Sequence, residues 1–275
     1  MEAKNVAEQL GDLNIPNQEL QKEINRLQRK PFADLKQVAI LHEWLESKRQ
    51  SKQSCRVVGE SRTGKTVACN SYHLRHKPKQ EVGKPPQVPV VYLQVPLECG
   101  AKDLFQGIIE YLKYQMTNGT VPEIRKRTMT VLQRCGVEMI ILDEADRCKA
   151  KTFAEIRDIF DHLNIAIVLV GTDRLDAVIK KDEQVYNRFR PCYRFGKLVG
   201  EDFIDTIETW EEEVLKLPQP SNLTGKKMLK LIAEATQGYI GIMDVVLRES
   251  AIRALKKGLK KIDYDTLKEV VQEYK

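Results

Sequence analysis

The sequence predicts an α/β protein in which a five-stranded parallel sheet, flanked by helices, precedes a small C-terminal helical lid domain. Three observations predict this class. Five β-rich runs alternate with helical periods; two of these runs, residues 139–142 and 165–170, are apolar enough to be buried on both faces; and no strand pattern follows residue 200. Because strands separated by helices pair in parallel, we expect helices on both faces of the sheet.

The elements are expected in the following order. Residues 1–30 form an N-terminal helical extension of two short polar helices separated by Pro16, with Leu20, Ile24 and Leu27 at helical spacing in the second. Residues 31–199 form the α/β domain, which opens with an amphipathic helix over positions 35–45. Its strands are expected at residues 54–58, 88–95, 138–142, 165–170 and 192–195, and the proline-rich residues 77–89 are expected to form a surface loop.

Residues 200–275 are expected to form the helical lid domain. Helical periods cover residues 201–217, 224–236, 242–257 and 263–274, and the breaks between them fall at Pro218, Pro220, Gly238 and Gly258. The chain is thus divided into an extension, a sheet domain and a lid.

Composition excludes several classes of protein. The 275 residues are 42% hydrophobic and 31% charged, which is typical of a globular chain. No apolar run reaches the 18 residues of a membrane span, and the first residues lack a signal peptide pattern, so we expect a cytoplasmic protein without a membrane partner. The six cysteines include no C-x-x-C pair, which favours reduced, structural thiols.

Positive charge is concentrated in one segment. The whole chain carries +6, whereas residues 48–84 contain ten basic and two acidic residues and a second basic cluster covers residues 253–261. Such clusters fit a polyanion, either nucleic acid or nucleotide, although solvated helix surfaces have the same pattern.

A phosphate-binding loop follows the first predicted strand. The motif G-x-x-x-x-G-K-[ST] is matched in full by Gly59, Glu60, Ser61, Arg62, Thr63, Gly64, Lys65 and Thr66. Its backbone N–H groups and the start of the next helix would hold the phosphates of ATP. Lys65 would reach the β- and γ-phosphates, and the Thr66 hydroxyl would bind Mg²⁺.

An acidic pair ends the third predicted strand. Asp143 and Glu144 follow the apolar residues 139–142, at the carboxyl edge of the sheet where ligands bind in such folds. Asp143 would hold Mg²⁺ directly or through water, and Glu144 would polarise the attacking water.

Two further positions fit phosphate chemistry. Thr172 or Asp173, after the fourth strand, lies beside the γ-phosphate if that strand neighbours the first; a plain helix N-cap is the alternative. Arg188 or Arg190, before the last strand, suits a finger that completes a neighbouring subunit's site, with a surface ion pair as the alternative.

In this order, residues 59–66, 142–146, 170–172 and 187–189 resemble the motifs of an AAA+ ATPase with a helical lid. The longer strings at 55–66 and 171–178 resemble the TnsC/TniB branch, whose members are ATP-dependent transposition regulators. The compact size resembles TnsC of type V CRISPR-associated transposons.

This resemblance implies an ATPase that assembles on duplex DNA as a hexameric ring or helical filament, in the bacterial cytoplasm at the nucleoid. The implied partners are the transposase, a TniQ-like target selector and a CRISPR effector. It also implies that Lys102 and Thr120 contact the DNA backbone without reading its sequence. The alternative places Lys102 on a helix surface and Thr120 at a helix cap.

One position departs from the AAA+ pattern. Where a sensor arginine would follow Gly241, the chain has Ile242, and Arg248 lies two turns further on. We therefore expect slow hydrolysis that serves as a switch. Alternative functions are a replication initiator or loader, a metabolic P-loop kinase, and a switch that binds ATP without hydrolysing it.

Overall fold

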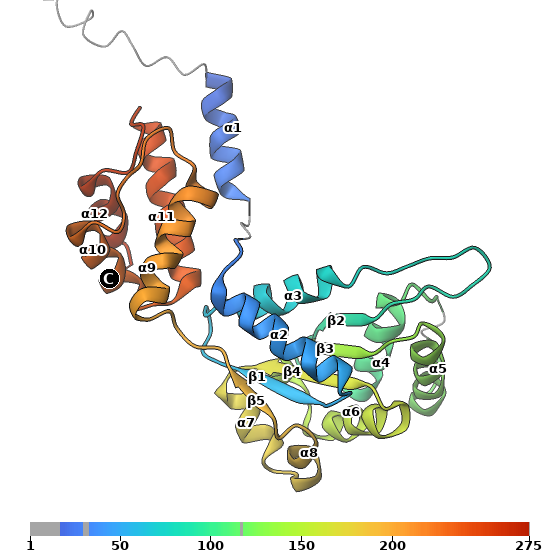
Figure 1. Cartoon of the computed structure of the whole chain (residues 1–275). Helices are drawn as coiled ribbons and strands as arrows, with labels where there is room; N and C mark the ends of the chain where they lie inside the picture. The colour runs from blue at the N-terminus through green and yellow to red at the C-terminus, as the bar shows by residue number, and fades with distance from the viewer. Residues whose placement is uncertain (1–16, 30–32, 116–117, 275) are drawn as a thin grey trace, which may run out of the picture. The chain divides into compact units, whose positions relative to one another are not determined.

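The computed structural model describes residues 17–29, 33–115 and 118–274, which divide into two compact units (Figure 1). The sheet unit is residues 36–196. The helical unit joins the described residues up to Leu35 to those from Lys197 onward. The sequence-based division placed residues 1–30 in a separate extension, whereas the described part of that segment belongs to the helical unit.

The sheet unit contains the parallel sheet that the sequence predicts. Its strands lie in the order β2-β3-β4-β1-β5, and every neighbouring pair is parallel. Two register pairs matter for the site: Val58 lies opposite Gly171, and Gln94 lies opposite Asp143. The strands are β1 (Cys55–Val58), β2 (Val90–Gln94), β3 (Met139–Asp143), β4 (Ala166–Gly171) and β5 (Cys192–Arg194).

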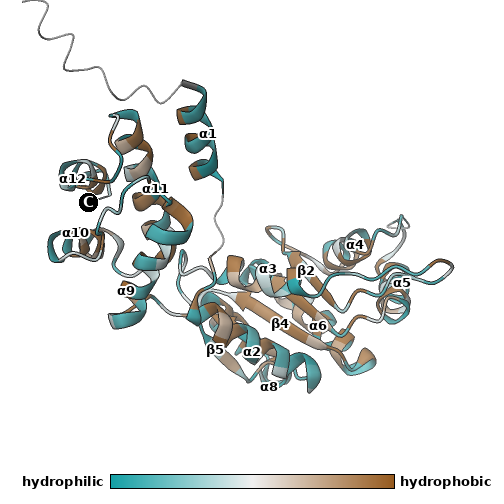
Figure 2. Ribbon diagram, turned by 45° about the horizontal axis from the view of Figure 1, so that its top comes forward, coloured by the Kyte–Doolittle hydropathy of each residue, from teal (hydrophilic) through white to brown (hydrophobic). Residues whose placement is uncertain are grey.

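Helices cover both faces of this sheet (Figure 1). One face meets α2 (Lys36–Gln50) and α3 (Lys65–Arg75). On the other face, alternate strand residues such as Ile140 and Leu169 share an apolar core with five helices, and Figure 2 shows β4 as a hydrophobic ribbon. These five are α4 (Ala101–Tyr111), α5 (Val121–Arg134), α6 (Ala150–Leu163), α7 (Asp173–Ile179) and α8 (Glu183–Arg188).

The proline-rich segment at residues 77–89 forms an exposed excursion between α3 and β2, as expected. Lys79 and Gln87 pair across it in an antiparallel bridge, and Val82 at its tip is fully exposed.

The helical unit packs the N-terminal helix against the C-terminal ones. Ile24 and Leu27 are buried, at 6% and 1% exposure, and α1 contacts α11. Arg26 donates hydrogen bonds to the Val214 and Leu215 carbonyls at 2.7 and 2.6 Å. The apolar face that the spacing predicted therefore has a partner in this unit. The helices are α1 (Asn17–Gln28), α9 (Gly200–Thr209), α10 (Lys226–Thr236), α11 (Ile240–Lys256) and α12 (Tyr264–Gln272). The helix expected before Pro16 lies outside the described residues.

The helix expected over residues 201–217 changes its geometry midway. After α9 the chain continues as the π-helical segment η2 (Trp210–Leu215), a rare conformation. The Glu211 carboxylate on this segment accepts hydrogen bonds from the backbone N–H groups of Asn222 and Leu223, at 3.0 Å each. Among the described residues, no helix combines the length and apolar character needed to cross a bilayer.

Candidate nucleotide-binding site

The phosphate-binding loop connects β1 to α3, as the motif predicts. Gly59 lies against β5, because a Cβ at this position would be 2.1 Å from the Phe195 carbonyl oxygen. Gly64 has φ 98°, a conformation that glycine adopts without strain, and α3 begins directly after it at Lys65. The loop therefore presents the N-terminus of α3, which favours negative charge.

Lys65 lies within the loop rather than on the surface. Its ammonium donates to the carbonyls of Gly59 and Glu60 at 2.8 and 2.6 Å, and the side chain is buried. Burial lowers the pKa of Lys65, and the carboxylate of Asp143 acts most strongly in the opposite direction. The neighbouring Thr66 is exposed in the first turn of α3.

Asp143 is almost completely buried at the end of β3, with 2% exposure. Its Oδ2 accepts a hydrogen bond of 2.6 Å from the Tyr92 hydroxyl, and its Oδ1 accepts one of 2.9 Å from the Glu144 backbone N–H. Burial, followed by the bond to Asp143, raises the pKa of Tyr92. The carboxylate is therefore oriented from both sides.

Glu144 has a strained backbone and two side-chain partners. Its φ of 57° lies in the left-handed region, which non-glycine residues adopt infrequently and often at functional sites. The carboxylate accepts a hydrogen bond of 3.0 Å from Gln94 at the end of β2, and it forms an ion pair with Arg147. Both partners come from segments that flank the carboxyl edge of the sheet.

Thr172 is expected beside the γ-phosphate if the fourth strand neighbours the first, and β4 does pair with β1. The Gly59 N–H donates to the Gly171 carbonyl at 3.3 Å, which brings the end of β4 beside the phosphate-binding loop. Thr172 is also the N-cap of α7, where its Oγ1 accepts from the Arg174 N–H at 3.4 Å and donates to Asp146 at 3.2 Å. The cap and the expected sensor position coincide, and the sensor role stays a prediction.

The two candidate finger arginines have different surroundings. Arg188 ends α8 and donates through Nε to Asp161 at 2.9 Å, with 45% of its side chain exposed. Arg190 is exposed, and its backbone carbonyl accepts a hydrogen bond of 2.8 Å from Arg56. Within one chain, Arg188 thus forms the surface ion pair that was the alternative reading.

Lys102 and Thr120 occupy the positions of the simpler alternative. Lys102 is exposed in the first turn of α4. Thr120 is the N-cap of α5, and the Glu123 carboxylate accepts from its backbone N–H at 2.8 Å and from its hydroxyl at 3.0 Å. A capping box is therefore present here, and contact of either residue with DNA stays a prediction.

Arg248, the arginine nearest to the expected sensor position, is bound by other residues of the helical unit. Arg248 donates to both carboxylate oxygens of Asp244, at 2.7 and 2.6 Å, and to the Leu27 carbonyl at 2.8 Å. Ile242 lies in the first turn of α11. These hydrogen bonds give Arg248 a structural role that joins α11 to α1.

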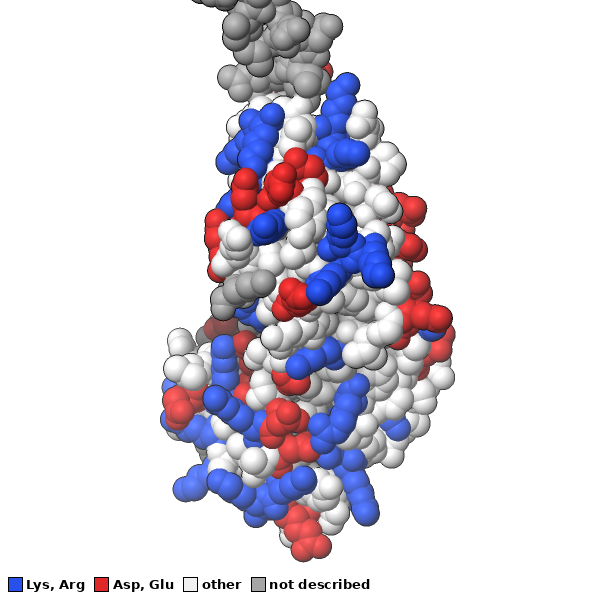
Figure 3. Space-filling view, turned by 90° about the vertical axis from the view of Figure 1, so that its left-hand side faces the viewer, with Lys and Arg blue, Asp and Glu red and all other residues white. Residues whose placement is uncertain are grey.

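The basic segment at residues 48–84 is not one surface patch. Arg56 is 5% exposed and donates to Asp176 at 2.7 Å, Lys65 is buried in the loop, and Arg49 pairs with Glu46. The face shown in Figure 3, the left-hand side of Figure 1, likewise carries Lys and Arg side chains interspersed with Asp and Glu. Part of the charge counted in the sequence is therefore used inside the fold.

Sequence reasoning missed the residues that orient the acidic pair. Tyr92 and Gln94 lie on β2 and donate to Asp143 and Glu144. Asp146, in the short 3₁₀ turn Ala145–Arg147, instead accepts from Thr172. A tyrosine and a glutamine at the end of an otherwise apolar strand were the available signal. Their partners depend on strand order, which the sequence pattern does not give.

The site fits a magnesium ion in the way typical of nucleotide-binding proteins. Mg²⁺ prefers oxygen ligands and is commonly held by one or two carboxylates together with substrate phosphates. Asp143 and Thr66 supply a carboxylate and a hydroxyl. Among the described residues, no group of three or more His, Cys, Asp or Glu side chains is placed to hold a metal by itself.

The fold and the site together define a AAA+ type P-loop protein. Similar solved structures include the Aeropyrum pernix ORC2 protein (ADPNP–ADP complexes; 15% identity, TM-score 0.67, 90% of this chain and 71% of that one). Cdc6p from Pyrobaculum aerophilum matches with 18% identity and a TM-score of 0.66, over 86% and 66% of the two chains. The Aeropyrum pernix ORC1 protein in complex with DNA matches with 18% identity and a TM-score of 0.68, over 91% and 69%.

A family model described as "Bacterial TniB protein" matches residues 26–197, more than half of the chain. The chain belongs to the TniB family. A Staphylococcus aureus protein described as "Potential ATP-binding protein" is 24% identical over 103 residues, which are 37% of this chain and 38% of that protein. The chain thus matches well under half of the length of this curated relative.

Proposed function

We propose that this protein is an ATP-dependent, DNA-binding regulator of DNA transposition. It assembles on duplex DNA as a ring or helical filament and links a target selector to the transposase. The observation that carries the proposal is the phosphate-binding loop beside an oriented Asp143–Glu144 pair in a chain of the TniB family. A solved structural neighbour is described in complex with DNA, and at 18% identity this likeness concerns the fold alone.

Each residue of the site has a separate role in ATP binding and hydrolysis. The N–H groups of the loop and the Lys65 ammonium bind the phosphates of ATP, and Thr66 and Asp143 hold Mg²⁺, which neutralises phosphate charge when bound. Glu144 takes up the proton of the attacking water. Thr172 senses the γ-phosphate, and Arg188 exchanges Asp161 for the phosphates of a neighbouring subunit. Because each ATP site uses an arginine of the neighbouring subunit, ATP binding and assembly depend on each other.

Nonspecific DNA binding is assigned to exposed cations and hydroxyls. Lys102 and Thr120 contact backbone phosphates, so affinity falls steeply with salt and is insensitive to base sequence. The selector is a TniQ-like protein with its CRISPR effector. The solved structures described as ORC2 and Cdc6p give no support to a replication role, because identities of 14–18% show the fold alone.

The test is a titration of the protein onto short duplex DNA at fixed salt with ATP, a slowly hydrolysed analogue, ADP or no nucleotide. The same samples are imaged by negative-stain electron microscopy. We expect rings or filaments with ATP and the analogue only. Weak binding that is independent of nucleotide, with no assemblies, would contradict the proposal and direct attention to phosphoryl transfer onto small molecules.

Variants make the test specific to the proposed surface. Lys102→Ala is expected to weaken DNA binding and to reduce its salt dependence, while ATP binding is retained. Lys268→Ala, an exposed lysine on α12 of the helical unit, is the matched control. Equal losses in both variants would remove Lys102 from the DNA interface.

A further inference from the structure

Tyr92 contacts two parts of the nucleotide site. It is on β2, next to β3, and its hydroxyl donates a hydrogen bond of 2.6 Å to Asp143 Oδ2. Its ring stacks on His73 of α3, with ring centres 5.9 Å apart and planes 26° apart. Helix α3 is the one that starts at the phosphate-binding loop. One side chain therefore contacts both the loop's helix and the buried carboxylate.

The ring of Tyr92 is itself fixed by neighbours. His73 also accepts or donates a hydrogen bond with the Tyr111 hydroxyl on α4, so the stacked imidazole is held from its other side. A phenol carried by a packed ring has little rotational freedom. Its hydroxyl is therefore presented to Asp143 in one direction.

The carboxylate of Asp143 needs such a partner. Rotation about the terminal bond of an aspartate is only weakly restricted, so packing alone does not choose which oxygen faces a ligand. Here Oδ1 accepts from the Glu144 N–H at 2.9 Å and Oδ2 accepts from Tyr92. Two donors on two different oxygens fix the plane of the carboxylate.

We propose that Tyr92 is a positioning residue for Asp143 and sets the affinity of the nucleotide site for its divalent cation. The proposal rests on the proposed function, because it needs a site that binds ATP with Mg²⁺. Hydrogen bonds to metal-binding carboxylates typically change metal affinity by about 10- to 100-fold when they are removed. Tyr92→Phe removes one hydroxyl and keeps the ring that stacks on His73.

Tyr72, which precedes His73 on α3, provides a matched control for Tyr92→Phe. The Tyr72 hydroxyl donates to Glu46 Oε2 at 2.8 Å, a phenol–carboxylate bond of similar length. Glu46 lies on α2 and is not part of the nucleotide site. Tyr72→Phe therefore makes the same chemical change at a carboxylate that lies outside the nucleotide site and pairs with Arg49.

The experiment measures binding of ATP by calorimetry across a Mg²⁺ titration and again in excess chelator. In Tyr92→Phe we expect the Mg²⁺ concentration for half-maximal enhancement of ATP binding to rise about tenfold. Binding of metal-free ATP and the thermal midpoint should match wild type. Tyr72→Phe should keep the wild-type Mg²⁺ dependence. Wild-type Mg²⁺ dependence in Tyr92→Phe, or an equal rise in Tyr72→Phe, overturns the proposal.

A double-mutant cycle keeps the proposal testable if Tyr92→Phe also lowers stability. In an Asp143→Asn background, Tyr92→Phe should cause no further change in Mg²⁺ dependence, since the carboxylate it orients is gone. Additive changes would show that Tyr92 acts elsewhere. Absence of ATP binding in the wild-type protein would instead refute the proposed function, so the two failures are distinct.

Discussion

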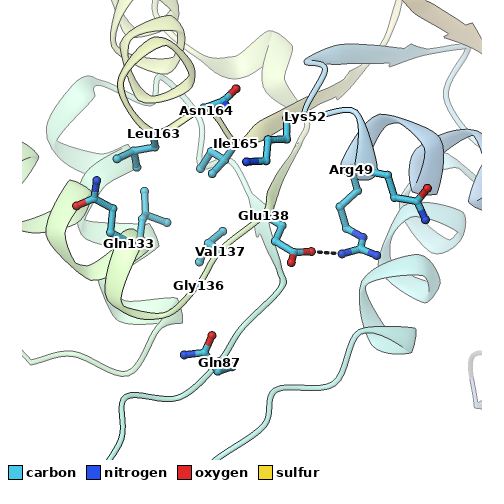
Figure 4. A pocket seen from close by; sticks show the side chains of 12 residues that line it. Arg49, Lys52, Gln87, Gln133, Gly136, Val137, Glu138, Leu163, Asn164 and Ile165 are labelled. Atoms are coloured by element: carbon cyan, nitrogen blue, oxygen red, sulfur yellow. Dashed lines mark hydrogen bonds and ion pairs between the residues drawn. The ribbon is translucent and has the colours of Figure 1, made fainter.

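The two edges of the sheet carry opposite kinds of helix end. At the carboxyl edge, α3 follows β1 through the phosphate-binding loop and α7 follows β4 through Thr172, so the free N–H groups and positive ends of both helices lie at this edge. At the amino edge, α2, α5 and α6 end around a cavity of about 620 Å³ (Figure 4). Each of these three helices is followed closely by a residue with positive φ, namely Lys52, Gly136 or Asn164.

The charges at the two edges match these helix ends. At the amino edge Arg49 points at Glu138, which precedes β3, and Lys52 and amide side chains line the same cavity (Figure 4). Helix C-termini attract cations of the protein itself. At the carboxyl edge the N-termini of α3 and α7 attract anions. The comparison teaches that helix direction, more than net charge, determines where a polyphosphate can bind.

The largest expected effect concerns the arginine that holds α7 in place at the carboxyl edge. Arg56 on β1 pairs with Asp176 and donates to the Phe189 carbonyl at 2.6 Å, and both charged side chains are nearly buried. Arg56→Met removes the hydrogen-bonded partner of Asp176 and leaves it only the longer ion pairs with Lys180 and Arg194, at 3.9 and 3.8 Å. The free energy of unfolding should therefore fall by about 3 kcal/mol, the lower end for a broken buried pair. Denaturant unfolding followed by circular dichroism measures this. The exposed Arg188 is the control, since Arg188→Met should cost at most about 1 kcal/mol. Similar losses of unfolding free energy in the two variants would contradict the difference expected between a buried and an exposed ion pair.

The next effect compares the two glutamates that flank β3. Glu144, after the strand, pairs with Arg147, and Glu138, before it, pairs with Arg49. Glu144→Gln should lower ATP turnover about 100-fold with ATP binding retained, because a general base is lost. Glu138→Gln should leave turnover within about twofold, since its edge carries no chemistry. Steady-state phosphate release measures the turnover of both variants. Equal losses would contradict the assignment of the chemistry to the carboxyl edge.

A smaller effect is expected from the two lysines. Lys65→Ala removes a cation that is buried in the loop and should weaken ATP binding at least about tenfold, the value of one charge-assisted hydrogen bond. Lys52→Ala removes an exposed cation from the amino edge and should leave ATP binding unchanged. Titration of a fluorescent ATP analogue gives both affinities. Weaker binding in Lys52→Ala would mean that long-range charge outweighs helix direction.

The smallest effect is a pH dependence near the amino edge. Hydrogen bonds from Arg49, and further ones from Tyr72 and Gln50, lower the pKa of Glu46 from 4.5 to about 2. The imidazole Nε2 of His76 also lies 3.5 Å from the Glu46 carboxylate. A lowered pKa favours the folded state above about pH 4.5, and this contribution is lost as the pH falls toward 2. Glu46→Gln should therefore be less stable than wild type at pH 6, and the difference should shrink by pH 3. A constant difference in unfolding free energy would contradict this.

The sequence predicted the fold well because its signals are local. Strand runs, the loop motif and the switch to helices after residue 200 each depend on neighbouring residues, and the structure has all five strands. Thr172 illustrates the limit of such signals. The sequence placed it after a strand, but its position beside the phosphate-binding loop required β4 to pair with β1.

Contacts between distant segments could not be predicted in the same way. Arg56 counted as part of a basic segment, whereas it pairs with Asp176, 120 residues further on. Tyr92 and Asp143 are brought together by strand order. The apolar spacing of Ile24 and Leu27 predicted a buried face, but nothing local indicated α11 as its partner. Each miss is a side-chain pairing decided by tertiary structure.

The grouping of α1 with the C-terminal helices has a consequence for the order of synthesis. The sheet unit is continuous, from residue 36 to residue 196, so the ribosome completes it while the last helices are still unmade. Chains generally fold domain by domain as they emerge. Helix α1 is synthesised before the sheet unit, whereas its contact with α11 can form only after α11 has left the exit tunnel. Helix α1 is thus made well before the helix against which it packs.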